Sequence, residues 1–283
     1  MPAEQPATAR SASGDEATLS RRGFDRIVEY FRRASGIRLS PSKHALVVMR
    51  LSKLAAAQDE PNLDRYVDGL LRGDFGEAEM RRVVDRLTTN ETYFFREPEH
   101  FRDFCTRLEG RPRQSWRVWS AASSSGEEIY SIAMVIADRL GLERADWGIV
   151  GTDLSSAMID TARRAIYPPG RIEGIPPAYL KRYCLRGVAD REGELLIDRR
   201  LRNRTTFRTL NLMEPLPPDH GPFDAIWLRN VLIYFDVEAK AAIVRRVLAA
   251  LAPNGVLYTG HSESLTNLGL PVRSIAPAVY VHA

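Results

Sequence analysis

The chain has 283 residues, 44% hydrophobic and 27% charged, which is enough for one large domain or two modest domains with separate cores. No apolar run approaches the roughly 20 residues that cross a bilayer, and Met1 to Ser20 lack the apolar segment of a secretory signal. Two cysteines are too few for a disulfide framework or a cysteine-based metal cluster. We therefore expect a cytoplasmic protein that neither inserts into membranes nor contains a metal site.

The net charge of +4 is unevenly distributed along the chain. Residues 1–110 hold 18 basic and 18 acidic side chains, whereas residues 171–209 hold 10 basic and 5 acidic ones. A local basic excess can attract an acidic partner or a phosphate backbone, and it is equally typical of a solvated, arginine-rich hairpin. The excess is small and confined to one segment, so no nucleic acid partner is expected.

The first part of the chain predicts a helical bundle. Residues 1–18 have too few apolar side chains to offset the entropy of ordering and are expected to be disordered. Apolar residues then recur at helical spacing. The predicted helices cover Phe24–Phe31, Ser42–Ala57, Leu63–Leu71 and Met80–Leu87. This pattern predicts an all-α N-terminal domain over residues 19–87, followed by a linker and helix over residues 88–110.

Residues 111–283 alternate between short apolar strands and helices, which predicts a parallel α/β sheet. The strands are expected at Arg117–Ser120, Trp147–Asp153, Phe223–Leu228 and Val256–Gly260, and the helices at Glu127–Leu140, Ser155–Ala165 and Val237–Leu251. Val272–Ile275 and Ala278–Val281 predict a closing hairpin around Pro277. Residues 171–209 break the alternation, and their short stretches Glu194–Ile197 and Thr205–Arg208 predict a small antiparallel β-subdomain inserted into the sheet.

A loop of small residues, Ser120–Gly126, follows the first predicted strand. Small side chains let a ligand approach the backbone, and cofactors bind at this edge of doubly wound sheets. The loop lacks the Gly-x-Gly-x-x-Gly fingerprint, which argues against a nicotinamide cofactor. Glu127 and Glu128 open the following helix. They can complement the helix dipole, or one of them can pair with a cationic group of S-adenosylmethionine (SAM).

Asp153 ends the second predicted strand. A carboxylate at this position can accept both hydroxyls of a ribose. It could instead cap the next helix, although Ser155 is better placed to do so.

Two further segments have side chains suited to binding. Thr88–Glu97 lies between the predicted domains and contains Arg96, whose guanidinium can hold a carboxylate in bidentate geometry. Arg229–Asp236 follows an apolar strand. In it, Asn230 offers both a donor and an acceptor, and Tyr234 can position a substrate oxygen or serve as a buried aromatic at a turn.

Together these segments resemble, in family order, the chemotaxis receptor methyltransferases of the CheR family. The matching stretches are Thr88–Glu97, Val118–Met134, Gly151–Tyr167, Phe223–Asp236 and Gly255–Leu265. The resemblance implies a class I SAM-dependent methyltransferase fold, a Rossmann-like sheet with a closing antiparallel hairpin. It also implies methyl transfer from SAM to glutamate carboxylates on cytoplasmic helices of chemoreceptors, giving glutamyl methyl esters and S-adenosylhomocysteine.

The resemblance also implies roles for individual residues. The implied cofactor contacts are Asn90, Thr92, Arg96, Glu128, Asp153, Asn211, Leu212, Asn230 and Val231. Arg96 and Tyr234 match the residues nearest the reacting methyl group, and Glu128 rather than Glu127 matches the pocket glutamate. The arginines between Arg21 and Arg38 are expected to form a basic face that meets acidic receptor helices, unless they form only a solvated helix face.

Three alternatives stay open. Family members that dock to a C-terminal receptor tether peptide have a glycine-rich loop in the inserted sheet. Arg186–Gly193 has only two glycines here, which favours an enzyme that works without a tether. Methylation of RNA or a small molecule is a second possible reaction, for which the basic insertion is weak support. A SAM-binding signalling adaptor without catalysis is the third possibility, and it has no need of Arg96 or Tyr234 to orient a nucleophile.

Overall fold

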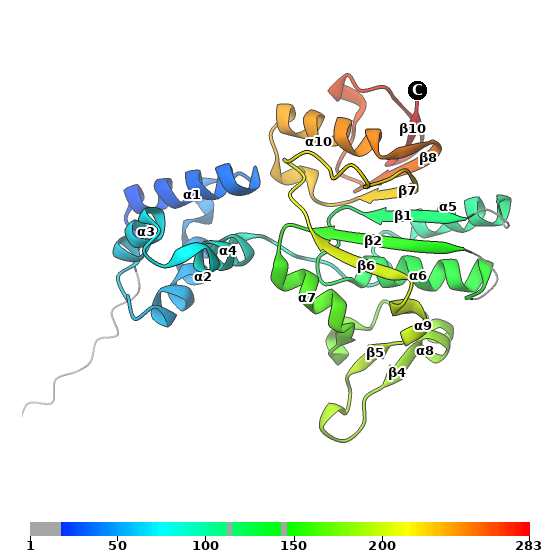
Figure 1. Ribbon diagram of the computed structural model, residues 1–283, viewed down its shortest axis with the longest axis horizontal. Helices are drawn as coiled ribbons and strands as arrows, with labels where there is room; N and C mark the ends of the chain where they lie inside the picture. The colour runs from blue at the N-terminus through cyan, green and yellow to red at the C-terminus, as the bar shows by residue number, and fades with distance from the viewer. Residues whose placement is uncertain (1–17, 112–114, 143–145) are drawn as a thin grey trace, which may run out of the picture.

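The computed structural model describes residues 18–111, 115–142 and 146–283, which form a helical bundle beside a larger α/β unit (Figure 1). The bundle contains α1 (Arg21–Ser35), η1 (Pro41–Lys43), α2 (His44–Ala57), α3 (Leu63–Arg72) and α4 (Gly76–Leu87). α1 begins where the Ser20 hydroxyl accepts a hydrogen bond from the Gly23 amide, and it ends at Gly36, which has a φ of 76°. The disorder predicted for the N-terminus concerns residues that, apart from residue 18, lie outside the described ranges.

The α/β unit is built on a seven-stranded sheet in the order β6-β2-β1-β7-β8-β10-β9. Its strands are β1 (Trp116–Ser120), β2 (Trp147–Asp153), β6 (Thr205–Thr209), β7 (Phe223–Leu228), β8 (Leu251–Thr259), β9 (Val272–Ala276) and β10 (Val279–His282). The first five strands of that order run parallel, and β10 pairs antiparallel with both β8 and β9. The predicted parallel sheet with a closing hairpin is therefore confirmed.

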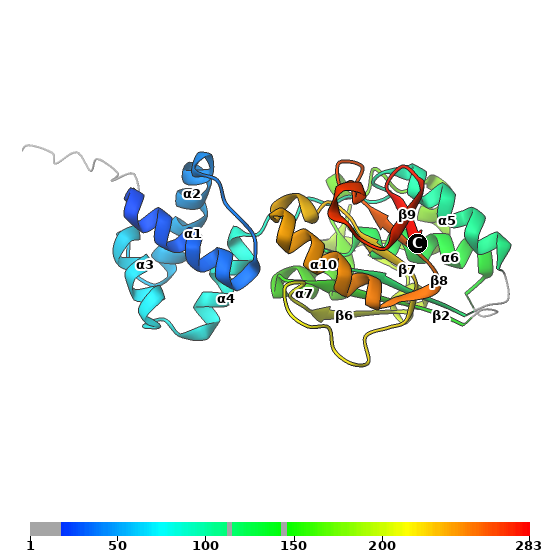
Figure 2. The ribbon, with the colours of Figure 1, turned by 90° about the horizontal axis from the view of Figure 1, so that it is seen from above.

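Alternation along the central strands gives the sheet two buried faces. Val118 belongs to a core shared with α5 (Pro98–Gly110) and α6 (Glu127–Leu140). Trp119, the next residue, belongs to a core shared with α10 (Val237–Ala249) and with the helical bundle. Figure 2 shows the bundle at one end of the α/β unit. Because the bundle and the α10 face share one hydrophobic cluster, the two units are packed together.

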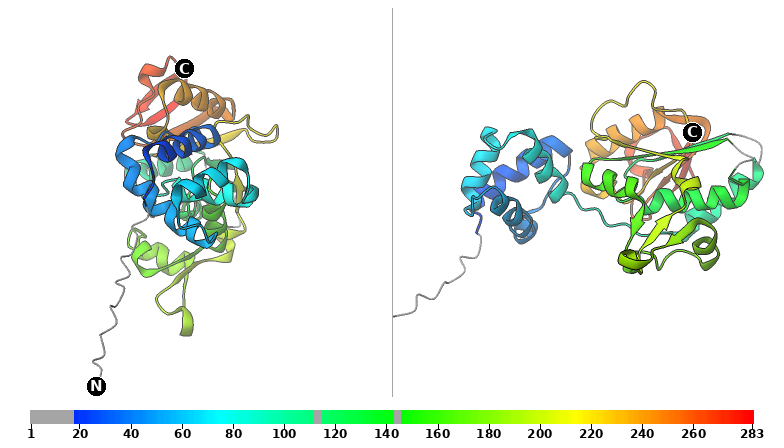
Figure 3. Two further views of the ribbon diagram at one scale, coloured as in Figure 1. Left: turned by 90° about the vertical axis from the view of Figure 1, so that its left-hand side faces the viewer. Right: turned by 60° about the horizontal axis from the view of Figure 1, so that its bottom comes forward.

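The remaining helices and strands form the connections and the insertion. They are α7 (Ser156–Arg164), β3 (Ile166–Tyr167), η2 (Pro169–Arg171), α8 (Pro177–Tyr183), β4 (Cys184–Arg186), η3 (Ala189–Arg191), β5 (Leu195–Ile197), α9 (Arg199–Arg202), η4 (Leu232–Tyr234) and η5 (Thr266–Leu268). β3, β5 and β4 form a separate antiparallel sheet that extends away from the large one (Figure 3). The antiparallel subdomain thus exists.

Several boundaries differ from the sequence-based expectation. β8 begins at Leu251 rather than Val256, and the small sheet includes β3, which precedes residue 171. Thr205–Thr209, expected in the insertion, forms β6 and pairs in parallel with β2 at the edge of the large sheet. Only Phe207 of this strand is buried, so its short polar sequence gave little sign of a sheet strand. The helix expected to end at Leu251 ends at Ala249, because Pro253 cannot continue a helix and Leu251 pairs with Phe223.

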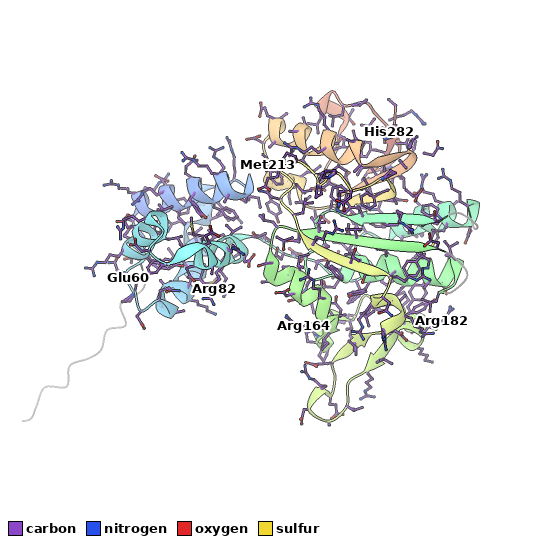
Figure 4. All side chains as sticks on the ribbon, viewed as in Figure 1. Glu60, Arg82, Arg164, Arg182, Met213 and His282 are labelled. Carbon is purple, nitrogen blue, oxygen red and sulfur yellow. The ribbon has the colours of Figure 1, made fainter. Side chains whose placement is uncertain are left out.

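Polar contacts join the bundle to the α/β unit. Asp85 on α4 accepts hydrogen bonds from the Ser156 amide (3.1 Å) and hydroxyl (3.0 Å) at the start of α7. The Arg38 amide donates to the Tyr234 carbonyl at 3.2 Å. Met213, labelled in Figure 4, lies at the junction, where a side chain at Gly36 would collide with it. Among the described residues, no helix has the length and apolar character needed to span a membrane.

Candidate active site

A pocket that is partly open to solvent lies where the bundle meets the carboxyl ends of β1, β2 and β7. The ten residues that the sequence analysis assigned to the site all line it: Asn90, Thr92, Arg96, Glu128, Asp153, Asn211, Leu212, Asn230, Val231 and Tyr234. Ser35 and Ile37 of the bundle complete the wall. The structure thus brings together groups from five separate parts of the sequence.

The loop after β1 forms the floor of this cavity. Gly126 has a φ of 96°, and a Cβ there would lie 2.9 Å from the Cβ of Ala162, so glycine is required at this turn. The Ser124 amide donates to Asp153 Oδ2 at 2.8 Å, and the Ser124 hydroxyl donates to the Asn90 carbonyl at 3.1 Å. This loop therefore links the end of β2 to the segment that joins the two domains.

Asp153 is 7% exposed, and burial raises the pKa of its carboxyl. Its Oδ1 accepts from the Ser155 amide at 2.9 Å and its Oδ2 from the Ser124 amide. The Leu154 amide also hydrogen-bonds this carboxylate, so about one of its four acceptor positions remains for a further donor. Ser155 itself caps α7 by accepting from the Met158 amide, so Asp153 is not needed for that purpose.

Glu128 lines the cavity, whereas Glu127 faces away from it. Glu128 accepts from the Ser120 hydroxyl at 2.7 Å and pairs with Arg229 at 3.1 Å. Burial nevertheless raises its pKa, and Arg229 opposes this shift. Glu127 is fully buried and bonds instead to the Ser125 hydroxyl at 2.6 Å.

Sequence reasoning assigned no role to Arg229. Its guanidinium is 1% exposed, donates to the Arg96 carbonyl, and pairs with both Glu128 and Glu97 at 3.1 Å. It thereby joins the end of β7 to the interdomain segment. The sequence did contain a sign of its role, because an arginine directly after an apolar strand becomes buried on folding and then needs charged or polar partners.

Arg96 differs from Arg229 because it forms no ion pair within the described part of the chain. Its Nη1 donates to the Glu91 carbonyl at 3.0 Å, and its guanidinium lies 5.4 Å from the centre of the Tyr93 ring. Burial raises the pKa of Tyr234, and the charge of Arg96 opposes that shift, so the two groups are within electrostatic reach. Arg96 is therefore a cation at the cavity without a carboxylate of its own.

The other predicted contacts differ in how their side chains are used. Asn211 donates to the Ala34 carbonyl of the bundle at 3.0 Å and accepts from the Met213 amide, so its side chain is already engaged. Leu212 and Val231 offer apolar surface. Asn230 has a φ of 55° and donates through Nδ2 to Glu97 at 3.3 Å.

Glu97, His100 and His261 bring potential metal-ligating atoms within 4.8 Å of one another. The Oε2 atom of Glu97 lies 3.1 Å from Arg229 and 3.4 Å from His100. A cation at this point would compete directly with the guanidinium. This arrangement therefore favours a buried polar contact over a metal centre.

Most arginines of the basic face expected on α1 take part in ion pairs. Arg32 and Arg33 both pair with Glu29 at 2.8 Å, Arg21 pairs with Asp25 at 3.1 Å, and Arg26 pairs with Asp68 of α3. Arg22 has no ion pair among the described residues. Acidic side chains thus interrupt the arginines on α1, and the helix keeps more basic than acidic groups because Glu29 serves two arginines.

The donor set of the cavity fits SAM. Asp153 keeps an acceptor position for a ribose hydroxyl, and Glu128 is a carboxylate suited to a cationic amino or sulfonium group. Leu154, Leu210 and Leu212 supply apolar surface for a flat base. An α/β sheet of this strand order with such a cavity defines a SAM-dependent methyltransferase.

Comparison with known proteins gives the family. Residues 22–88 match the family described as CheR methyltransferase, all-alpha domain, and residues 90–278 match the CheR methyltransferase, SAM binding domain. The chain is 38% identical over 250 residues to the chemotaxis protein methyltransferase of Salmonella typhimurium, covering 88% of this chain and 86% of that protein. It is 37% identical over 257 residues to the Escherichia coli protein of the same name, covering 90% and 88%, and 37% identical over 268 residues to chemotaxis protein methyltransferase 2 of Pseudomonas aeruginosa, covering 94% of each. The chain belongs to the CheR family of methyltransferases, and SAM is its cofactor.

Proposed function

We propose that this enzyme methylates glutamate side-chain carboxylates on the cytoplasmic helices of chemoreceptors, yielding glutamyl methyl esters and S-adenosylhomocysteine. The observation that carries the proposal is Arg96, which lines the cavity without an ion-pair partner among the described residues. A guanidinium in that position can bind an incoming carboxylate in fixed geometry. The names of the relatives, chemotaxis protein methyltransferases, support a chemoreceptor substrate.

The reaction needs alignment more than acid–base catalysis. A glutamate with an ordinary pKa near 4.3 is already ionised at neutral pH, so no general base is required. When bound, SAM supplies a methyl group on a positively charged sulfur, which leaves as a thioether. Arg96 and Tyr234 orient the carboxylate and leave one oxygen lone pair free to form the new C–O bond. Positioning of this kind can lower a barrier by roughly 7–11 kcal/mol.

The remaining predicted contacts hold the cofactor in this proposal. Asp153 binds a ribose hydroxyl, Glu128 attracts the cationic end, and Asn230 and Val231 border the adenine or the methionine part. The backbone rather than the side chain of Asn211 is available to the base, because its carboxamide is engaged by the bundle.

Transfer of a tritiated methyl group from SAM tests the proposal. With chemoreceptor cytoplasmic fragments, the label should enter protein and be released by mild alkali as volatile methanol, the property of a methyl ester. Label in RNA or in a small molecule would favour a different substrate. Binding of SAM without any transfer would favour a signalling adaptor.

We also propose that the enzyme works without a receptor tether peptide. The β4–β5 loop bonds to itself, with Gly187 donating to the Glu194 carbonyl at 2.8 Å and Glu194 donating to the Arg191 carbonyl at 3.0 Å. The outer edge of β4 is unpaired, however, and Leu185 is 52% exposed. Titration with a short peptide from the C-terminus of a chemoreceptor should give no saturable binding, and micromolar affinity would overturn this part of the proposal.

A further inference from the structure

Glu263 is a buried acid that the mechanism above does not use. It follows β8 and is 5% exposed, and within the described residues no basic side chain pairs with it. Burial raises the pKa of its carboxyl, while backbone hydrogen bonds oppose the shift. A buried carboxylate held only by amides must have those amides well placed to offset its loss of hydration.

Four backbone amides converge on this carboxylate, those of Asn230, Leu232, Ile233 and Gly260. Oε2 accepts from the Asn230 amide and from the Gly260 amide, both at 2.7 Å, and Oε1 accepts from the Ile233 amide at 3.1 Å. Asn230 and Ile233 belong to the segment between β7 and α10. Oε2 therefore holds the segment at Asn230, and Oε1 holds it at Ile233, next to Tyr234.

The same segment carries five residues that line the cavity, among them Asn230, Val231 and Tyr234. Asn230 has a φ of 55°, in the left-handed region that asparagine adopts more readily than most residues other than glycine. Gly260 completes the arrangement, since a Cβ there would lie 2.7 Å from both Asn230 Nδ2 and Glu263 Oε2. Any side chain larger than hydrogen at residue 260 would displace the Asn230 or the Glu263 side chain.

We propose that Glu263 is a positioning residue that fixes the β7–α10 segment through these amides and so sets the place of Tyr234 in the active site. The inference rests on the proposed function of Tyr234. The Oε2 contacts hold the cofactor end of the segment at Asn230, and the Oε1 contact at Ile233 holds the catalytic end beside Tyr234.

The variant Glu263→Gln tests the contact at Ile233 separately from the contacts at Asn230 and Gly260. Its single carboxamide oxygen can keep the Asn230 and Gly260 amides, whereas its NH2 group then faces the Ile233 amide and cannot accept. We expect turnover with receptor to fall about tenfold while the affinity for S-adenosylhomocysteine changes by less than threefold. In a Tyr234→Phe background, the same substitution should change turnover by less than twofold, because its effect acts through Tyr234. Glu238→Gln, an exposed change in the first turn of α10, is the matched control.

Unchanged turnover in Glu263→Gln, or an equal loss in both backgrounds, would overturn the inference. If Glu263→Gln does not fold, Gly260→Ala replaces it. That variant should weaken binding of S-adenosylhomocysteine and lower turnover together, and unchanged values of both would overturn the inference. Wild-type enzyme is assayed alongside. Failure of wild-type transfer to receptor rejects the proposed substrate, and the binding measurement on Gly260→Ala still tests whether the segment is held as inferred.

Discussion

Glutamates on the helical bundle and in the cavity have opposite electrostatic environments. On α1, Glu29 lies in solvent between Arg32 and Arg33, and these two partners lower its pKa to about 2. In the cavity, Glu128 also has an arginine at 3.1 Å, yet burial raises its pKa. Ion pairing therefore dominates at the surface, whereas at the cavity the effect of burial on the pKa outweighs that of the neighbouring arginine. In the proposed complex, a cationic cofactor would add a second positive charge beside Glu128.

The arginines repeat this contrast. Arg33 on α1 is bound by an acidic neighbour in its own helix, while Arg96 has none among the described residues. Exposed pairs are worth little, typically about 0–1 kcal/mol. A cation left unpaired at a cavity is available to a ligand. We therefore expect methyl transfer to depend strongly on the charged side chains of the cavity and only weakly on the charged side chains of α1.

Removal of Arg96 is the strongest test of this contrast. Arg96→Ala should lower turnover with receptor at least about 100-fold, because a displaced nucleophile loses its alignment. Binding of S-adenosylhomocysteine is measured by calorimetry to separate this effect from cofactor loss. Arg164→Ala, an exposed change on α7, is the control. Near-normal turnover of Arg96→Ala would reject its assignment.

Asp153→Asn should mainly affect cofactor affinity. The loss of a charged acceptor for a ribose hydroxyl is expected to weaken binding of S-adenosylhomocysteine about 10- to 100-fold, or roughly 1.4–2.7 kcal/mol. Calorimetry provides the dissociation constant, and thermal unfolding shows whether the Ser124 and Ser155 contacts survive. An unchanged dissociation constant would mean that the ribose lies elsewhere.

Glu128→Gln tests the raised pKa. Because burial raises the pKa of Glu128, its carboxylate takes up a proton at a higher pH than an exposed glutamate does. Protonation removes the negative charge, so SAM affinity should fall as the pH is lowered from 8 to 5, and Glu128→Gln should flatten this dependence by several-fold. Equal pH profiles for the variant and the wild type would show that another group is responsible. Glu77→Gln, an exposed change on α4, is the control.

The smallest effect is expected on α1. Arg33 is 76% exposed and shares Glu29 with Arg32, so Arg33→Ala should change the KM for receptor by less than about twofold. Steady-state kinetics with receptor fragments measure it. A tenfold rise in KM would support the prediction that α1 presents a basic recognition face, and it would contradict the contrast between surface and cavity.

Local sequence patterns predicted the helices and strands well where the structure of a segment depends mainly on its own residues. The helix Glu127–Leu140 and the strand Phe223–Leu228 have the predicted ends. β6 was assigned to the insertion because its identity depends on pairing with β2, which lies far away in sequence. The end of α10 was placed two residues too late, because strand pairing between Leu251 and Phe223 competes with the helix.

The cavity residues were anticipated because each had an unusual position at a strand end or a domain junction. Arg229 and Glu263 were missed because their partners come from distant segments. Arg229 contacts residues more than 100 positions away, and Glu263 contacts residues 30 and 33 positions away. A single sequence does not show which distant segments lie close together in space. The structure was therefore needed to show that one guanidinium pairs with two carboxylates.

The contact between Asp85 and Ser156 makes the two units mutually dependent. The positive end of a helix is usually neutralised by its own chain just upstream, yet here part of that negative charge comes from the other unit. Removing the bundle would take this acid away from α7 and remove Ser35 and Ile37 from the cavity wall. The helical bundle is thus a structural part of the cavity, and a partner that binds the bundle binds a unit that also contacts the start of α7.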